Sequence, residues 1–162
     1  ARIGDERTSV SLPRLEAQQL LLLALGRDPH DRAWLTAHDD QTLDANASTR
    51  LDALLARHRA GEPMAYLRGE QAFFGLPLRV DRRVLAPRPD TETLVQWALD
   101  VLAERPPAAR VIDLGTGSGA IALALKHQRP ALRMHASDAS ADALAVAREN
   151  AARLGLELAL HQ

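Results

Sequence analysis

Three alternating glycines in residues 115–119 form the part of this sequence best suited to holding a ligand. The segment follows an apolar stretch that ends in Asp113 and Leu114. Its members are Gly115, Thr116, Gly117, Ser118 and Gly119. Alternating glycines leave a turn without side chains that would block a small molecule, and backbone N–H groups at the start of the next helix would face that molecule. We therefore expect a strand, a glycine loop and a helix around a bound small molecule.

One carboxylate stands where it would meet the ribose of a bound nucleoside. Asp138 lies 19 residues after Gly119, at the expected carboxyl end of the next strand. A carboxylate there accepts hydrogen bonds from both hydroxyls of an adenosine ribose. The alternative is that the glycines serve close packing alone and that Asp138 caps the following helix. The loop and the acid together favour nucleoside binding.

The glycine loop alone leaves two cofactors open. Gly115-x-Gly117-x-x-Ala120 satisfies the dinucleotide fingerprint. The alternation of glycines directly after Asp113 instead resembles the signature of seven-stranded methyltransferases, whose loop packs beside the methionine part of S-adenosylmethionine. A pyrophosphate needs a helix dipole aimed at it, whereas a zwitterionic methionine does not.

The elements that would position this site alternate between strand and helix. We expect strands over residues 111–114, 132–137 and 156–160, and helices that start at 120–126 and span 140–154. Strands separated by helices of this length indicate a parallel, doubly wound α/β sheet. Such sheets usually have about five or more strands, so we expect a longer protein of which this is the amino-terminal portion, with an exposed strand edge and an uncovered apolar face.

Three regions are expected along the chain. Residues 1–61 are expected to form a small all-α domain, 62–86 a hairpin linker, and 87–162 the first half of the α/β domain. The first helix is expected to have Ser11 as its N-cap and Leu12, Leu15 and Leu22 on one face. Further helices are expected around 31–37 and from Ser48 onward.

The hairpin and the helix after it complete the expected core. Strands are expected over 71–74 and 78–80, joined at 75–77. Residues 87–92 lead into a helix. Its shared apolar face is expected to hold Leu94, Ala98, Val101 and Leu102. The aromatic residues Phe73, Phe74 and Trp97 are expected in the core.

Composition excludes several classes of protein. Twenty basic and 21 acidic residues give a net charge of −1, so the chain has no basic arm for nucleic acid. Its longest apolar run, residues 20–25, is far shorter than the ~20 residues that cross a bilayer. No cysteine is present, and the six histidines lack metal-site spacing. We expect a cytoplasmic protein without a metal.

The wider sequence resembles the HemK/PrmC family, the glutamine methyltransferases of peptide-chain release factors. The likeness rests on residues 61–69 (GEPMAYLRG), 73–78 (FFGLPL), 84–92 (VLAPRPDTE) and 113–125 (DLGTGSGAIALAL). Residues 84–92 are the most specific part. The likeness covers essentially the whole chain.

The resemblance implies transfer of a methyl group from S-adenosylmethionine to the glutamine amide nitrogen of the Gly-Gly-Gln motif in bacterial class 1 release factors. It implies that residues 115–119 and Asp138 hold the cofactor. Arg88, Thr91 and Glu92 match the segment that closes over its methionine end in related methyltransferases. The helical domain would help to dock the release factor.

The sequence departs from the family pattern in two places. Ala86 stands where many relatives have isoleucine, which is a packing change of little consequence. The family's Asn-Pro-Pro-Tyr motif, which grips the substrate amide, does not occur in these 162 residues. The resemblance places that motif after the fourth strand of the sheet, so we expect it beyond Gln162, the last residue given. We therefore expect no catalytic residue in this chain and no methyl transfer by the chain alone.

Three rival functions stay open from the sequence. The first is a nicotinamide-dependent oxidoreductase, because the dinucleotide fingerprint is also satisfied. The second is an adenine-N6 methyltransferase, although the balanced charge argues against a duplex DNA substrate. The third is a non-catalytic module that binds a release factor through residues 11–61. We expect no membrane contact and no direct nucleic-acid binding.

Overall fold

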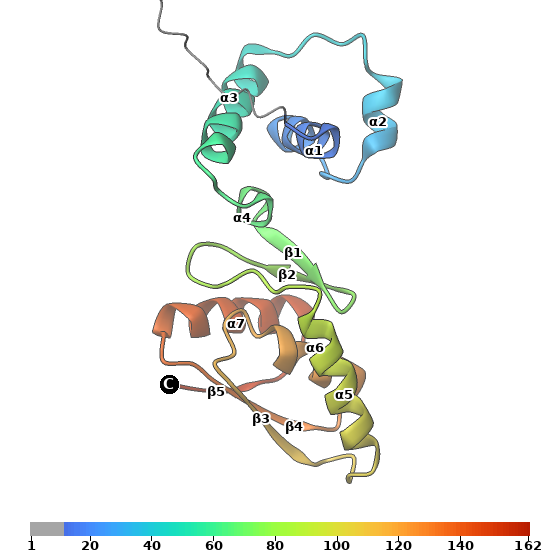
Figure 1. Cartoon of the computed structure of the whole chain (residues 1–162), viewed down its shortest axis with the longest axis vertical. Coiled ribbons are helices and arrows are strands. Elements are labelled where there is room, and N and C mark those ends of the chain that lie inside the picture. The colour runs from blue at the N-terminus through green and yellow to red at the C-terminus, as the bar shows by residue number, and fades with distance from the viewer. Residues whose placement is uncertain (1–11) are drawn as a thin grey trace, which may run out of the picture. The chain divides into compact units, whose positions relative to one another are not determined.

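The computed structural model describes residues 12–162, which form two compact units that divide between Leu67 and Arg68. Figure 1 shows the elements of each unit along the chain. The boundaries expected from the sequence, 1–61, 62–86 and 87–162, stay a prediction. No helix in the described part of the chain is long and apolar enough to cross a membrane.

The first unit is helical, with α1 (Arg14–Ala24), α2 (Arg32–Ala37), α3 (Ala45–Arg59) and the short α4 (Met64–Arg68), whose last residue belongs to the second unit. Helices α1 and α3 pack against each other. The side chain of Arg50 on α3 donates from Nε to the carbonyl of Ala24 at 2.6 Å, and Glu16 on α1 lies 3.1 Å from the Nε2 atom of His58. This unit is the small helical module that the sequence predicts.

Two helix starts differ from the prediction. Ser11, the expected cap of α1, lies outside the described residues, and the helix begins directly after Pro13, whose fixed φ suits a helix entrance. Helix α3 begins before Ser48 because the carboxylate of Asp44 accepts the N–H of Ala47 at 2.7 Å. The expected apolar face of α1 is wrong at Leu15, which is exposed, whereas Leu22 is buried.

The second unit opens with an antiparallel hairpin of β1 (Glu70–Phe73) and β2 (Leu76–Arg79). Its turn is Phe74-Gly75, both with positive φ, which is the geometry of a tight two-residue hairpin turn. The predicted turn at 75–77 is therefore wrong. Pro77 lies within β2 opposite Ala72, where a two-stranded ribbon tolerates a residue without an N–H.

A three-stranded parallel sheet follows, in the order β3-β4-β5. The strands and helices of this part of the unit are α5 (Thr91–Ala103), β3 (Arg110–Leu114), α6 (Ala120–Gln128), β4 (Arg133–Ser137), α7 (Ala141–Leu154) and β5 (Ala159–His161). The strand–helix alternation confirms the predicted Rossmann-like α/β class. The last strand is shorter than the predicted 156–160 and extends one residue beyond it.

One face of this sheet is buried and the other is exposed. Met134 and Ala136 on β4 belong to the core, together with buried residues of α6. On the opposite face Ile112 is 55% and Leu114 74% exposed. The prediction of a buried strand over 111–114 is therefore wrong for half of its residues, because alternate residues of a strand point to opposite faces.

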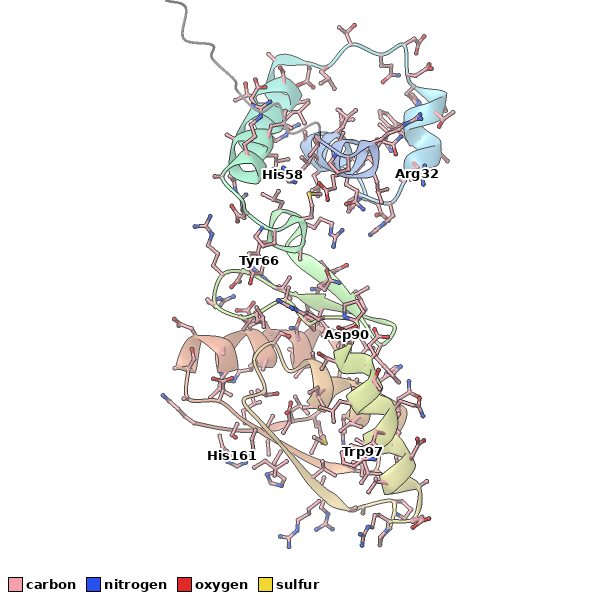
Figure 2. All side chains as sticks on the ribbon, viewed as in Figure 1. Arg32, His58, Tyr66, Asp90, Trp97 and His161 are labelled. Atoms are coloured by element: carbon pink, nitrogen blue, oxygen red, sulfur yellow. The ribbon has the colours of Figure 1, made fainter. Side chains whose placement is uncertain are left out.

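Helix α5 buries only part of the predicted face, since Leu102 is buried and Ala98 packs against the core as expected. Val95 and Leu102 are buried and Leu99 is half-buried, which is the spacing of one helix face. The predicted Leu94 and Val101 are exposed. Trp97, labelled in Figure 2, is 64% exposed, so its expected place in the core is also wrong. Phe73 is fully buried as expected.

Candidate cofactor site

The glycine loop joins β3 to α6 and has the backbone shape that only glycine adopts easily. Gly115, Gly117 and Gly119 have φ angles of +73°, +56° and +83°, a region that side chains disfavour. A Cβ atom on Gly115 or Gly117 would meet nothing within 4 Å. The same atom on Gly119 would lie 3.1 Å from Leu123 Cδ1 and 3.3 Å from Ala147 Cβ. The first two glycines border open space, whereas Gly119 permits close packing of α7.

Most N–H groups of the loop donate within the protein. Gly115 and Thr116 donate to the carbonyl of Ser137 at 2.8 and 2.9 Å, and Gly119 donates to the carbonyl of Thr116 at 2.9 Å. The N–H of Gly117 donates to Asp138. These four N–H groups precede α6, so the expectation that N–H groups at the start of that helix face a ligand stays a prediction.

Asp138 lies beside the loop and does not cap the following helix. Its Oδ2 accepts the N–H of Gly117 at 2.9 Å, and its Oδ1 accepts the N–H of Ser140 at 2.9 Å. The cap of α7 is Ser140, whose hydroxyl accepts the N–H of Ala143. The structure thus brings Asp138 into contact with the glycine loop, although Asp138 and Gly117 are 21 residues apart in the sequence. A carboxylate has about four acceptor positions, so each oxygen can accept a further hydrogen bond.

Two polar residues of the loop are buried and shape it from inside. Thr116 donates from its hydroxyl to Asp113 Oδ2 at 2.7 Å. Ser118 is 2% exposed. Both residues were expected to contact a ligand. The Thr116 side chain closes the turn between the end of β3 and the loop, and the expected ligand contact of the two residues stays a prediction.

The first turn of α5 contacts the hairpin. Glu92 Oε1 accepts the N–H of Phe74 at 2.7 Å, which supports the positive φ of that residue. Arg88 is exposed, and Thr91 is the first residue of α5. Within residues 12–162 neither side chain makes a hydrogen bond or ion pair with the glycine loop. The expected contact of Arg88 and Thr91 with the cofactor stays a prediction.

The expected position of the substrate-gripping motif, beyond Gln162, stays a prediction. Gln162 directly follows β5, the third strand of the parallel sheet, and its side chain is exposed. The fourth strand after which the family resemblance places the Asn-Pro-Pro-Tyr motif is not among the described residues 12–162. The candidate site described here is therefore a cofactor site, and none of its residues is assigned to the grip on a substrate amide.

An ion-pair cluster joins the last residue of β2, and the segment that follows it, to α7. Arg83 lies 2.6 Å from Asp81 and 3.2 Å from Glu149, and Arg79 lies 3.3 Å from Glu149. The side-chain hydrogen bond from Arg83 lowers the pKa of Asp81 to about 2, and the same contact raises the pKa of Arg83. All these side chains are at least partly exposed, so the cluster orients the segment more than it stabilises it.

Asn150 is a residue that the sequence reasoning missed. It is fully buried on α7 and hydrogen-bonds both the hairpin and the glycine loop. A polar residue among the apolar positions Leu144, Ala147 and Ala151 was the available signal. Sequence spacing did not indicate what it would contact, because Arg79 lies 71 residues away.

Comparison with known proteins gives the same assignment for both parts of the chain. The family model of the PrmC N-terminal domain matches residues 6–69, and that of the methyltransferase small domain matches residues 91–162. Release factor glutamine methyltransferase of Bordetella pertussis is 51% identical over 94% of this chain and 55% of its own length. Those of Vibrio cholerae and Escherichia coli are each 45% identical, over 89% and 90% of this chain.

The chain spans about half the length of these curated relatives. A crystal structure of coclaurine N-methyltransferase aligns with 90% of this chain and 47% of its own, with a TM-score of 0.44 and 16% identity. That level of similarity supports no conclusion about this chain.

The fold and the glycine loop are those of a Rossmann-like methyltransferase domain, which follows a helical domain in the sequence. More specifically, the chain belongs to the release factor glutamine methyltransferase family, which confirms the resemblance seen in its sequence.

Proposed function

We propose that this chain binds S-adenosylmethionine at Gly115–Gly119 and Asp138, as part of an enzyme that methylates the glutamine of the Gly-Gly-Gln motif in bacterial class 1 release factors. The observation that carries the cofactor site is the contact of Asp138 with Gly117. It joins the two halves of a nucleoside site at the carboxyl ends of adjacent parallel strands, where such folds bind their ligands. Family membership supports the release-factor glutamine as the acceptor of the methyl group.

The residues present fit this cofactor. The open space beside Gly115 and Gly117 gives an adenosine or methionine group room to approach the backbone. The remaining acceptor positions of Asp138 suit the two ribose hydroxyls. The bound cofactor would supply a methyl group on a positively charged sulfur. Arg88 and Thr91 belong to this proposal on the family resemblance alone.

Family membership favours this cofactor over a dinucleotide. A pyrophosphate is held by free backbone N–H groups at a helix N-terminus. In this loop the N–H groups of Gly115, Thr116, Gly117 and Gly119 already donate within the protein. A nucleoside with a zwitterionic tail depends less on those donors. The nicotinamide-dependent alternative is the weaker one because both matching family models belong to methyltransferases.

Methylation of a glutamine amide requires above all that its nitrogen be positioned against the donor methyl group. The lone pair of an amide nitrogen is delocalised into its carbonyl group, so the nitrogen is a poor nucleophile. Alignment of that nitrogen against the donor methyl group has to supply much of the acceleration. The Asn-Pro-Pro-Tyr motif, to which the family resemblance assigns this alignment, is not among these residues. We propose that the helical unit contributes by docking the release factor, in the bacterial cytoplasm.

Calorimetric titration of the chain with S-adenosylmethionine, with NAD as the comparison ligand, tests the cofactor. We expect saturable binding of S-adenosylmethionine alone. Asp138→Ala should weaken it by at least about tenfold, because hydrogen bonds to a charged group are lost. The matched control is Asp142→Ala, which removes an exposed carboxylate from the first turn of α7 and should bind like the wild type. Binding of NAD, or of neither ligand, contradicts the proposal.

A further inference from the structure

Asn150 connects three separate elements through one buried side chain. Its Oδ1 accepts the N–H of Arg79 on β2 at 2.7 Å, and its Nδ2 donates to the carbonyl of the same residue at 3.0 Å. The second hydrogen of Nδ2 points to the carbonyl of Ser118 in the glycine loop, at 2.9 Å. Asn150 itself lies on α7 and is 0% exposed. Its side-chain amide is therefore fully used by the hairpin and the loop.

The bond to Ser118 satisfies a carbonyl that helix α6 leaves out. The first helical bond of α6 runs from the N–H of Leu123 to the carbonyl of Gly119, so the carbonyl of Ser118 precedes the helix ladder. Within residues 12–162, Asn150 is the one group that donates to it. A buried carbonyl without a donor is costly. The peptide group between Ser118 and Gly119 is thus held at both ends, by Asn150 at its carbonyl and by the carbonyl of Thr116 at its N–H.

The loop is held from both sides of the same short stretch. Asp138 accepts the N–H of Gly117, and Asn150 donates to the carbonyl of the next residue, Ser118. Ala147, one turn before Asn150 on α7, closes the space beside Gly119. Asp138 is exposed enough to serve a ligand as well, whereas Asn150 is not. Asp138 can therefore hold the loop and also contact a ligand, whereas Asn150 can only hold the loop.

We propose that Asn150 is the positioning residue of the glycine loop. It fixes the loop in the shape that leaves Gly115 and Gly117 open, and it ties that shape to the β1–β2 hairpin through Arg79. Its consequence for S-adenosylmethionine binding rests on the proposed function. Asparagine suits this place because it offers an acceptor and two donors on one short, uncharged side chain. Aspartate keeps the size and the acceptor but loses the donors.

Amide hydrogen exchange followed by NMR tests the proposal without a ligand. Both Nδ2 hydrogens of Asn150 should be protected in the wild type. In Asn150→Asp and Asn150→Ala the N–H groups of Gly117 and Gly119 should exchange at least about tenfold faster relative to that of Val95 in α5, as expected for the loss of a buried hydrogen bond. The matched control is Val146→Ala, which removes fully buried volume from α7 without touching these bonds.

The outcomes separate a positioning role from a purely structural one. Selective loosening of the loop in the Asn150 variants, absent in Val146→Ala, supports the proposal. Uniform acceleration across the chain, the same loop exchange in the control, or unprotected Nδ2 hydrogens in the wild type overturns it. S-adenosylmethionine should bind at least about tenfold more weakly to Asn150→Asp than to Val146→Ala. If the wild type does not bind it, the proposed function fails while the exchange result still decides the role of Asn150.

Discussion

Substitution of Gly119 by alanine separates two physical effects in the glycine loop. Gly119 has a φ of +83°, and an added Cβ atom would lie 3.1 Å from Leu123 Cδ1 and 3.3 Å from Ala147 Cβ. The matched change is Gly117→Ala, where φ is +56° and nothing lies within 4 Å of the new atom. Both variants place alanine in left-handed backbone. Only the first also forces atoms together.

The magnitudes follow from these two terms. Left-handed backbone costs an alanine about 1–2 kcal/mol, which is the whole expected loss of unfolding free energy for Gly117→Ala. Overpacking adds about 1–3 kcal/mol. Gly119→Ala should therefore lose about 2–5 kcal/mol in total. The excess depends on how far the flexible end of Leu123 and the backbone of α7 can yield.

Equilibrium unfolding in urea, followed by circular dichroism, measures the difference. We expect the midpoint of Gly119→Ala to fall well below that of Gly117→Ala, at a similar slope. Equal losses in the two variants would refute the argument, because they would mean that the contact between α7 and Gly119 is not tight. A larger loss for Gly117→Ala would show that the space beside that residue is filled.

Three further predictions concern the rest of the chain. Trp97→Gln should change the free energy of unfolding by no more than about 0.5 kcal/mol because the side chain is exposed, whereas Val95→Ala on the buried face of α5 should cost about 2 kcal/mol; urea unfolding of both variants checks the order, and the reverse order would contradict the assigned face. The folded-state pKa of Asp81, about 2, lies below its ordinary 3.8, so the residue stabilises the fold above pH 3.8 and loses that effect as the pH falls through about 2. The advantage of the wild type over Asp81→Asn should shrink across this interval, and a gap independent of pH would contradict the ion pair. The 162 residues alone should transfer no labelled methyl group from S-adenosylmethionine to a release factor, since the Asn-Pro-Pro-Tyr motif is absent; turnover would show that another group aligns the amide.

Local sequence signals predicted the elements well but not always their exposed sides. The order of strands and helices from residue 110 onward follows from glycine and proline positions and from short apolar runs, which are local properties. The buried face of α5 was predicted correctly at Leu102 but wrongly at Leu94 and Val101, because those two residues fit a helical period as well as Val95 does. Both choices are apolar. Which of them is buried depends on where α6 lies, and α5 packs against that helix.

The candidate site divides in the same way. The sequence by itself determined the glycine loop, the carboxylate of Asp138 and the family, since these depend on residue types at fixed spacing. Only the tertiary structure decided that the loop's N–H groups are largely used inside the protein, and that Asn150 holds Ser118 and Arg79. The physical reason is that a buried amide finds its partners through space. The packing of α7 against the loop and the hairpin brings together residues that no local pattern connects.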